Sequence, residues 1–209
     1  MTFYIAIIDY GLGNLKSISK LLNHLNVKNK ITAEDNEILD ADGIILPGVG
    51  AFRDAMSNLK DRCLIPILRK SISQKKPLFG ICLGMQLLFS KSFEMGETRG
   101  LDFINGEVLL FDKSKVDKVP QIGWNSVNFT KINNYLINNI ASSSYFYFVH
   151  SYYCVPENKE LILGKTKYGE IEFCSMICKD NIIATQFHPE KSSKDGIEIY
   201  RNFINYCKR

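Results

Sequence analysis

Residues that could do covalent chemistry meet in the segment Gly80-Ile-Cys-Leu-Gly84, which lies between two apolar runs. In a Gly-x-nucleophile-x-Gly pattern, a buried strand turns sharply into a helix, and the glycines are needed because no side chain fits so close to the turn. A helix starting at the next residue would direct unpaired N–H groups at the sulfur and favour the thiolate. We therefore predict Cys82 as a nucleophile. Burial in the core is the ordinary expectation for the cysteines that lack such glycines, which are Cys63, Cys154, Cys174, Cys178 and Cys207.

A cysteine nucleophile needs a general base, and the chain has three histidines. His188 follows an apolar run at 182–187, and Pro189 favours an extended backbone at His188. Glu190 could accept a hydrogen bond from the imidazole and stabilise its charged form, which predicts a Cys82, His188, Glu190 triad. The other two histidines are weaker candidates for the base. His24 is expected on a helix surface, and His150 is expected as a half-buried, hydrogen-bonded side chain that could line the pocket.

A glycine-rich loop, Pro47-Gly-Val-Gly50, follows a strand-like run that begins at Gly43. Proline cannot donate to a sheet, so the strand must end at Pro47. The glycines let the backbone approach a ligand closely and present its N–H groups. Such a loop beside an elbow could hold an oxyanion, although the pattern is equally typical of an ordinary turn.

The predicted elements of the first half place these residues at one edge of a sheet. Strand-like and helical runs alternate, which predicts a mostly parallel central sheet with helices on both faces. Ligands bind at the carboxyl ends of the strands in that architecture, where both glycine loops and Cys82 fall. The predicted strands are 4–8, 30–33, 43–46 and 77–81. The predicted helices are 14–25, 51–59, 64–73 and 85–90, with Asn14 as the N-cap of the first and a brief helical turn at 38–42.

From Gly106 onward the predicted elements are short strands, so the C-terminal half is expected to be rich in hairpins. Asn-Asn pairs at 133–134 and 138–139 predict an irregular loop or a weak helix, and a helix at 197–206 closes the fold. The fold class is therefore α/β in a single domain. The predicted strands of this half are 107–111, 126–129, 145–149, 161–163, 171–178 and 182–187.

Composition excludes several classes of protein. A chain of 209 residues suits one large domain or at most two small ones, and its net charge of +4 comes from scattered basic residues, unlike a nucleic-acid-binding surface. No apolar run approaches the ~18 residues of a membrane span, so no membrane association is expected. Six irregularly spaced cysteines and the lack of a basic N-terminal signal region favour a reducing cytoplasm. No histidine lies near Cys174 and Cys178, so no metal site is predicted. No cofactor is predicted either.

Two motifs together, Gly80-Ile-Cys-Leu-Gly-Met-Gln86 and His188-Pro-Glu190, resemble those of the class I glutamine amidotransferase family. That family combines a Gly-x-Cys-x-Gly-x-Gln elbow with a distal His-x-Glu. The resemblance covers the whole chain, which is expected to form one type 1 glutamine amidotransferase domain over residues 1–209. Four segments resemble, within the family, the glutaminase subunits of imidazole glycerol phosphate synthases: Pro47-Gly-Val-Gly-Ala-Phe52, Val119-Pro-Gln-Ile-Gly-Trp-Asn125, Tyr147-Phe-Val-His-Ser-Tyr152 and Gln186-Phe-His-Pro-Glu-Lys-Ser192.

This resemblance implies hydrolysis of L-glutamine to glutamate and ammonia by Cys82, His188 and Glu190. It also implies a heterodimer in which the ammonia passes to a (βα)8-barrel cyclase subunit that makes imidazole glycerol phosphate and AICAR in histidine biosynthesis. Little activity is expected before the partner binds its substrate, with a rearrangement of the Pro47–Gly50 loop as the switch. The further roles it implies are oxyanion binding by the N–H groups of Val49 and Leu83, glutamine binding at Gly48, Gly50, Gln86, Ser151 and Tyr152, and partner contact at Trp124, Tyr147 and Lys191.

Three alternatives stay open from the sequence. A related glutaminase could feed ammonia to another synthase, such as one that amidates a surface sugar, with the same residues around Cys82. A redox or stress protein with a cysteine elbow would explain the thiol but not Gln86 or the His-Pro-Glu segment. A regulatory subunit without catalysis is disfavoured by the intact triad.

Overall fold

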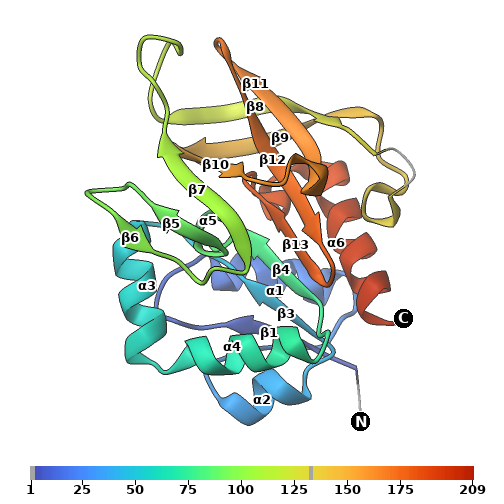
Figure 1. Cartoon of the computed structure of the whole chain (residues 1–209). Coiled ribbons are helices and arrows are strands. Elements are labelled where there is room, and N and C mark those ends of the chain that lie inside the picture. Colours follow the sequence, from blue (N-terminus) through green and yellow to red (C-terminus); the bar gives the residue numbers. More distant parts are fainter. Residues whose placement is uncertain (1–2, 132–133) are drawn as a thin grey trace.

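The computed structural model describes residues 3–131 and 134–209, which fold around one mixed sheet (Figure 1). Five neighbouring strands in the order β2-β1-β3-β4-β13 run parallel to one another. Every residue of β1, β3, β4 and β13 is buried, as expected for strands covered on both faces. The bounds of the five are β1 (Ile5–Ile8), β2 (Asn29–Thr32), β3 (Gly43–Leu46), β4 (Leu78–Ile81) and β13 (Ile182–Thr185).

Helices cover both faces of these parallel strands (Figure 1). On one face, α1 (Leu15–His24) and α6 (Ser193–Cys207) pack into an apolar cluster that includes Ile7 and Phe79. On the other face, α2 (Asp35–Asp40), α3 (Phe52–Asp61) and α4 (Leu64–Ser73) form a second cluster with strand residues such as Leu46. The predicted parallel sheet with helices on both faces is thereby confirmed.

The rest of the sheet is mainly antiparallel, which confirms the predicted hairpin-rich half. Strand β12 pairs antiparallel with β13 and carries the sheet onward through β10, β7, β5 and β6, while β11, β8 and β9 form a branch from β12. The strands are β5 (Phe89–Ser92), β6 (Thr98–Arg99), β7 (Ile104–Leu110), β8 (Gln121–Phe129), β9 (Ser143–His150), β10 (Tyr152–Pro156), β11 (Ile162–Tyr168) and β12 (Ile171–Lys179). The described residues also form the short 3₁₀ helices η1 (Tyr135–Ile137), η2 (Lys159–Leu161) and η3 (Pro189–Lys191).

The helix predicted at 85–90 is wrong in its bounds. The helix α5 spans only Leu83–Leu87, and the chain enters β5 at Phe89. The carbonyl groups of Leu87, Leu88 and Phe89 accept hydrogen bonds from backbone N–H groups at 101–104 instead of continuing a helical ladder. Pairing with a distant segment therefore overrides the local apolar pattern. The strands β5, β6 and β10 were not predicted.

Two smaller expectations also need correction. The turn predicted at 38–42 is α2, which begins three residues earlier at Asp35 and ends at Asp40. Asn14 precedes α1, but its side chain makes no capping hydrogen bond, and only its backbone carbonyl accepts one, from Ile18 N–H at 3.3 Å. Between β8 and β9, η1 matches the weak helix expected there, although residue 133 of the first Asn-Asn pair lies outside the described residues.

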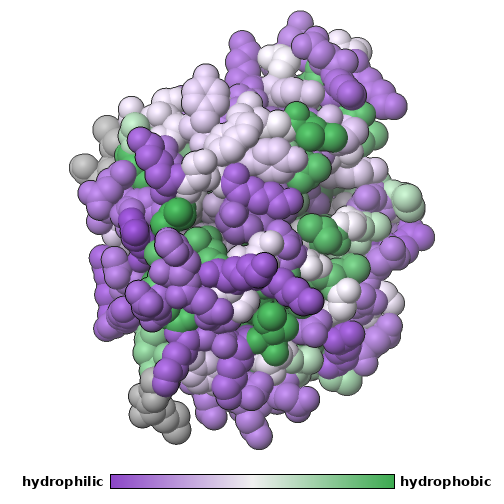
Figure 2. All heavy atoms as spheres, turned by 180° about the vertical axis from the view of Figure 1, so that it is seen from behind, coloured by the Kyte–Doolittle hydropathy of each residue, from purple (hydrophilic) through white to green (hydrophobic). Residues whose placement is uncertain are grey.

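The described residues contain no helix both long enough and apolar enough to cross a membrane. On the face seen in Figure 2, hydrophobic residues form separate small groups among hydrophilic ones. His24 is exposed at the end of α1, as expected.

Candidate active site

Cys82 lies where β4 turns into α5, with φ 55° and ψ −109°. Non-glycine residues rarely adopt a positive φ, so the backbone is strained at the predicted nucleophile. Hydrogen bonds on both sides hold this conformation: Cys82 N–H donates to Thr185 O at 2.7 Å, and Cys82 O accepts from Met85 N–H at 3.0 Å. Leu83 is the first residue of α5, so its N–H has no acceptor within the helix. The strand-to-helix turn predicted from the glycine spacing is present.

The two glycines of the elbow are required by close packing. A methyl group built on Gly80 would lie 2.9 Å from Gly84 O, and one built on Gly84 would lie 1.9 Å from Leu46 O. Gly48 is similarly enclosed, because a methyl group there would lie 2.8 Å from both Gly84 N and the Cβ of Leu83. The end of β3 and the loop after it therefore pack directly against the elbow.

His188 follows β13, which pairs with β4 so that Thr185 lies opposite Ile81. Its side chain is 2% exposed, and its Nδ1 lies 2.9 Å from Glu190 Oε1, whose side chain is 1% exposed. Burial disfavours the charged imidazole, but interaction with Cys82 and Glu190 outweighs burial and raises the pKa of His188 to about 10. The raised pKa keeps the His188 imidazole protonated at neutral pH. Parallel strand ends thus bring Cys82 together with His188 and Glu190, which are distant from it in the sequence.

A cavity of about 330 Å³ opens at this edge of the sheet, and both Cys82 and His188 line it. The predicted site residues that do not line it are Gly48, Glu190, Trp124, Tyr147 and Lys191. The other predicted residues that line it are Val49, Gly50, Leu83, Gln86, Ser151 and Tyr152.

Gln86 and Gln186 link the walls of this cavity. Gln86 Nε2 donates to Tyr152 O at 3.0 Å and to Gln186 Oε1 at 3.1 Å, while Gln186 Nε2 lies 3.8 Å from Cys82 Sγ. Sequence reasoning gave Gln186 no role, although it lies two residues before His188 on the same segment. Its amide fixes Gln86 relative to the thiol.

Glu94 also lines the cavity and was not predicted. It follows β5, and its Oε2 accepts a hydrogen bond of 2.7 Å from Phe52 N–H at the start of α3. Its carboxylate is an acidic group in the wall of a cavity that also contains the backbone of Val49 and Gly50. The only sequence signal was an isolated acid near the predicted elbow helix, which is too common to be informative.

His150 lines the cavity but is 7% exposed. Its Nδ1 lies 2.8 Å from Tyr152 O, so Nδ1 carries the proton, and the described residues provide no partner for Nε2. Burial lowers the pKa of His150 to about 4, and it is neutral at physiological pH. The expected half-buried histidine is thus more buried than predicted and only partly hydrogen-bonded.

The three residues expected at a partner interface lie together on the outward face of β8 and β9. Trp124 is 52% exposed and lies opposite Tyr147 in the β8–β9 ladder, with their ring centroids 6.4 Å apart. Lys191 Nζ lies 5.6 Å from the centre of the Tyr147 ring. Ile122 and Tyr145, both more than half exposed, extend this apolar surface along the same two strands.

Within the described ranges, no group of three or more His, Cys, Asp or Glu side chains is arranged to hold a metal ion. The cysteines are all free thiols.

Comparison with known proteins agrees with this geometry. The family model for class-I glutamine amidotransferases matches residues 6–206. The imidazole glycerol phosphate synthase subunit HisH of Aquifex aeolicus is 46% identical over 199 residues, covering 95% of this chain and 94% of that protein. The subunit of the same name from Methanosarcina mazei is 49% identical over 209 residues, covering 97% and 98%.

Solved structures agree on the fold. PurLQS from Thermotoga maritima superimposes with a TM-score of 0.76 at 17% identity, covering 99% of both chains. At that identity the likeness concerns the fold alone, whereas the family model and the relatives extend it to the sequence motifs. The chain belongs to the class-I glutamine amidotransferase family, and within it to the group of imidazole glycerol phosphate synthase subunits.

Proposed function

We propose that this chain is the glutaminase subunit of an imidazole glycerol phosphate synthase. It hydrolyses L-glutamine to glutamate and ammonia and delivers the ammonia to a cyclase subunit in histidine biosynthesis. The single observation that carries the proposal is a strained elbow cysteine sharing a cavity with His188, whose other ring nitrogen is held by the buried Glu190. Family membership and the names of the similar subunits support the reaction and the pathway.

The first chemical step forms a thioester. The Cys82 thiolate attacks the side-chain amide carbon of glutamine, and the carbonyl oxygen becomes an oxyanion. Backbone N–H groups of Val49 and Leu83 hold this oxyanion, each such donor being worth roughly 10²–10³ in rate. His188, whose raised pKa keeps it protonated, donates its proton to the departing ammonia. The carbon–nitrogen bond breaks and the carbon–sulfur bond remains.

The second step hydrolyses the thioester. Neutral His188 takes a proton from a water molecule, the resulting hydroxide attacks the carbonyl carbon, and the Cys82 thiolate leaves with glutamate as the product. Glu190 orients the imidazole through Nδ1 in both steps and stabilises its charged form. The three residues therefore act as a triad.

The cavity offers complementary groups for the amino-acid end of glutamine. The carboxylate of Glu94 suits the α-ammonium group, and polar groups of Gln86, Ser151 and Tyr152 suit the α-carboxylate and side-chain amide. Gly48 and Gly50 let the loop approach the substrate closely.

The exposed face of β8 and β9 is the proposed docking surface for the partner, a (βα)8-barrel cyclase. Trp124 and Tyr147 are aromatic residues of the kind that dominate binding energy at interfaces, and Lys191 adds a positive charge beside them. Pro120, just before β8, and Val149 in β9 line the cavity, so a partner on this face would dock near the cavity mouth. The free chain should have low activity if the partner is needed to bring the Pro47–Gly50 loop into its active conformation.

The proposal also covers the extent of the domain and the cellular compartment of the protein. Residues 1–209 form one glutamine amidotransferase domain, and the family match over 6–206 supports this. The six free thiols support a reducing cytoplasm.

The test is release of glutamate from glutamine by the purified chain, with and without the candidate cyclase and its nucleotide substrate, and with Cys82→Ala as the blank. Strong stimulation by the cyclase that disappears in Cys82→Ala is the expected result. Activity that this cyclase does not stimulate would indicate another ammonia acceptor. No Cys82-dependent glutamate under any condition would refute the glutaminase.

A further inference from the structure

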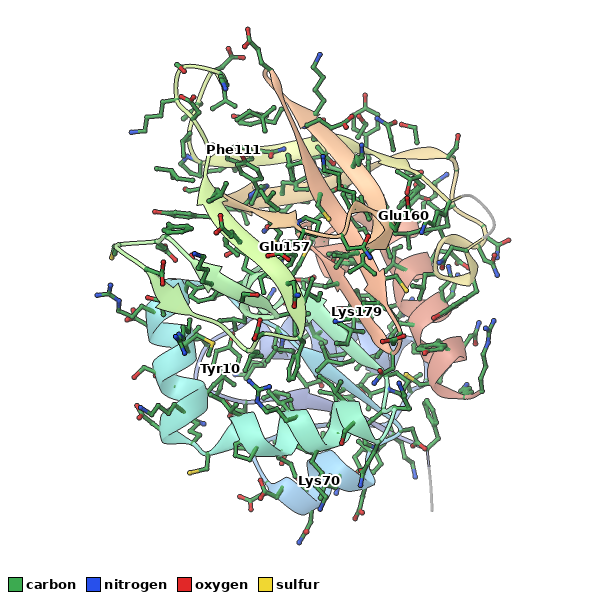
Figure 3. The ribbon with its side chains drawn as sticks, viewed as in Figure 1. Tyr10, Lys70, Phe111, Glu157, Glu160 and Lys179 are labelled. Atoms are coloured by element: carbon green, nitrogen blue, oxygen red, sulfur yellow. The ribbon has the colours of Figure 1, made fainter. Side chains whose placement is uncertain are left out.

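Tyr10 follows β1 and is completely buried in the interior of the molecule (Figure 3). Its hydroxyl donates a hydrogen bond of 2.7 Å to the carbonyl of Pro47, in a buried environment. Pro47 directly follows β3 and opens the Pro47–Gly50 loop. Thus a side chain from one strand end holds the first carbonyl of the loop at the next strand end.

The same hydroxyl also touches the place where the loop meets the elbow. A methyl group on Gly48 would lie 2.7 Å from Tyr10 Oη and 2.8 Å from both Gly84 N and Leu83 Cβ. Burial raises the pKa of Tyr10, and the nearby Cys82 raises it further, so the hydroxyl stays neutral and remains a donor. The Pro47–Gly48 peptide is therefore enclosed by Tyr10 on one side and by the elbow on the other.

The other end of the loop is held separately. Phe52 N–H donates to Glu94 Oε2 at 2.7 Å just after the loop. Between these two attachments, Val49 is 42% exposed, and Gly50 has φ 98° with no atom within 4 Å of a methyl group built on it. The freedom of the loop is thus confined to its middle.

We propose that Tyr10 is a positioning residue that fixes the Pro47–Gly48 peptide and thereby the direction of the Val49 N–H. The inference rests on the proposed glutaminase, in which that N–H binds the oxyanion. Without the hydroxyl, the buried Pro47 carbonyl would lose this donor and turn to find another, rotating the adjoining peptide. The oxyanion exists only after attack on glutamine, so the loss affects the chemical step rather than substrate binding.

The experiment compares Tyr10→Phe with Tyr4→Phe in the complex with the cyclase and its nucleotide substrate. Tyr4 Oη makes the same type of bond, to Glu37 O at 2.7 Å, at the start of β1 and away from the cavity. We expect Tyr10→Phe to lower kcat about 10-fold, less than the 10²–10³ for loss of a whole oxyanion donor, with KM within about twofold. Tyr4→Phe should leave both constants within about twofold of wild type.

A second readout separates positioning from general damage to the elbow. Alkylation of Cys82 by iodoacetamide requires a reactive thiol but no oxyanion, so its rate should change by less than about twofold in Tyr10→Phe. Expressing kcat per mole of folded protein, measured by circular dichroism, counts only folded sites. Tyr10→Met also removes the hydroxyl but fills the space with a flexible side chain. It should show the same fall in kcat, and it serves as the test variant if Tyr10→Phe does not fold.

Two results would overturn the inference: equal kcat in the Tyr10→Phe and Tyr4→Phe variants, or a parallel fall of kcat and alkylation rate in the Tyr10 variants. Failure of the underlying glutaminase would look different, because wild type itself would then release no Cys82-dependent glutamate.

Discussion

Replacing Gly84 by alanine tests whether the packing of the elbow against β3 sets the active-site geometry. The added methyl group would lie 1.9 Å from Leu46 O, and atoms in proteins do not approach a Cβ closer than 3.0 Å. The elbow and the end of β3 must therefore separate by at least 3.0 − 1.9 = 1.1 Å. Both partners are backbone, so no side chain can move aside instead.

That separation pulls Cys82 away from the loop that carries Val49. A displacement of about 1 Å at a reacting centre can cost 10²-fold in rate, so kcat should fall about 100-fold. Overpacking should also lower the free energy of unfolding by about 1–3 kcal/mol. The assay is glutamate release by the cyclase complex, expressed per mole of folded protein, with urea unfolding of the free chain measured in parallel.

Gly106→Ala is the matched control. Its methyl group would lie 2.3 Å from the backbone oxygen of Val155, and its φ of 143° adds backbone strain that Gly84 lacks. The residue lies on β7 opposite Pro156 and outside the cavity lining. It should lose stability while kcat per active site stays within about twofold of wild type. A folded Gly84→Ala variant with kcat within threefold of wild type would show that contact between the elbow and β3 does not set the catalytic geometry.

Three other variants test separate parts of the site. Glu190→Gln removes a group that raises the pKa of His188, so that pKa should fall, kcat should drop at least about 100-fold, and Cys82 alkylation at pH 6 should slow; unchanged alkylation at pH 6 would contradict this. The pKa of His150 is about 4 in the folded chain and about 6.5 in the unfolded chain, so as the pH falls the unfolded chain binds the proton first. The stability that neutral His150 contributes is therefore complete above pH 6.5 and is lost as the pH falls to 4. The unfolding free energy of wild type should therefore fall by about 2 kcal/mol more than that of His150→Phe between pH 7.5 and pH 5, and equal falls would refute the assignment. Trp124→Ala should weaken cyclase binding by about 2 kcal/mol, roughly 30-fold in Kd, measured by calorimetry, whereas an unchanged Kd would remove Trp124 from the interface.

The chemistry of the site could be predicted because its signals are local. Glycines two residues on either side of Cys82 specify a turn, and the separation of His188 and Glu190 places the acid within reach of the imidazole. Short, wholly apolar runs ending in glycine loops also predicted the parallel strands and hence the edge at which these residues lie.

The missing parts depend on contacts between distant segments. The helix predicted through Ser90 stops at Leu87 because the next carbonyls bond to residues 101–104, which no local pattern reveals. Treating that segment as helix hid β5, and with it the position of Glu94 beside the cavity. Gln186 was overlooked for a related reason, since its amide matters only because β13 pairs with β4.

One strand connects the cavity with the exposed face proposed for the partner. In β9, His150 lines the cavity, while Tyr147 lies on the outward face with its ring beneath Lys191. The backbone of Tyr147 accepts a hydrogen bond from His188 N–H at 2.9 Å and donates one to Ser192 Oγ at 3.0 Å. A partner that shifts Tyr147 therefore acts directly on the backbone that carries the candidate base. Coupling between docking and glutamine hydrolysis needs no path through the core, because one backbone hydrogen bond joins Tyr147 on the outward face to His188 in the cavity.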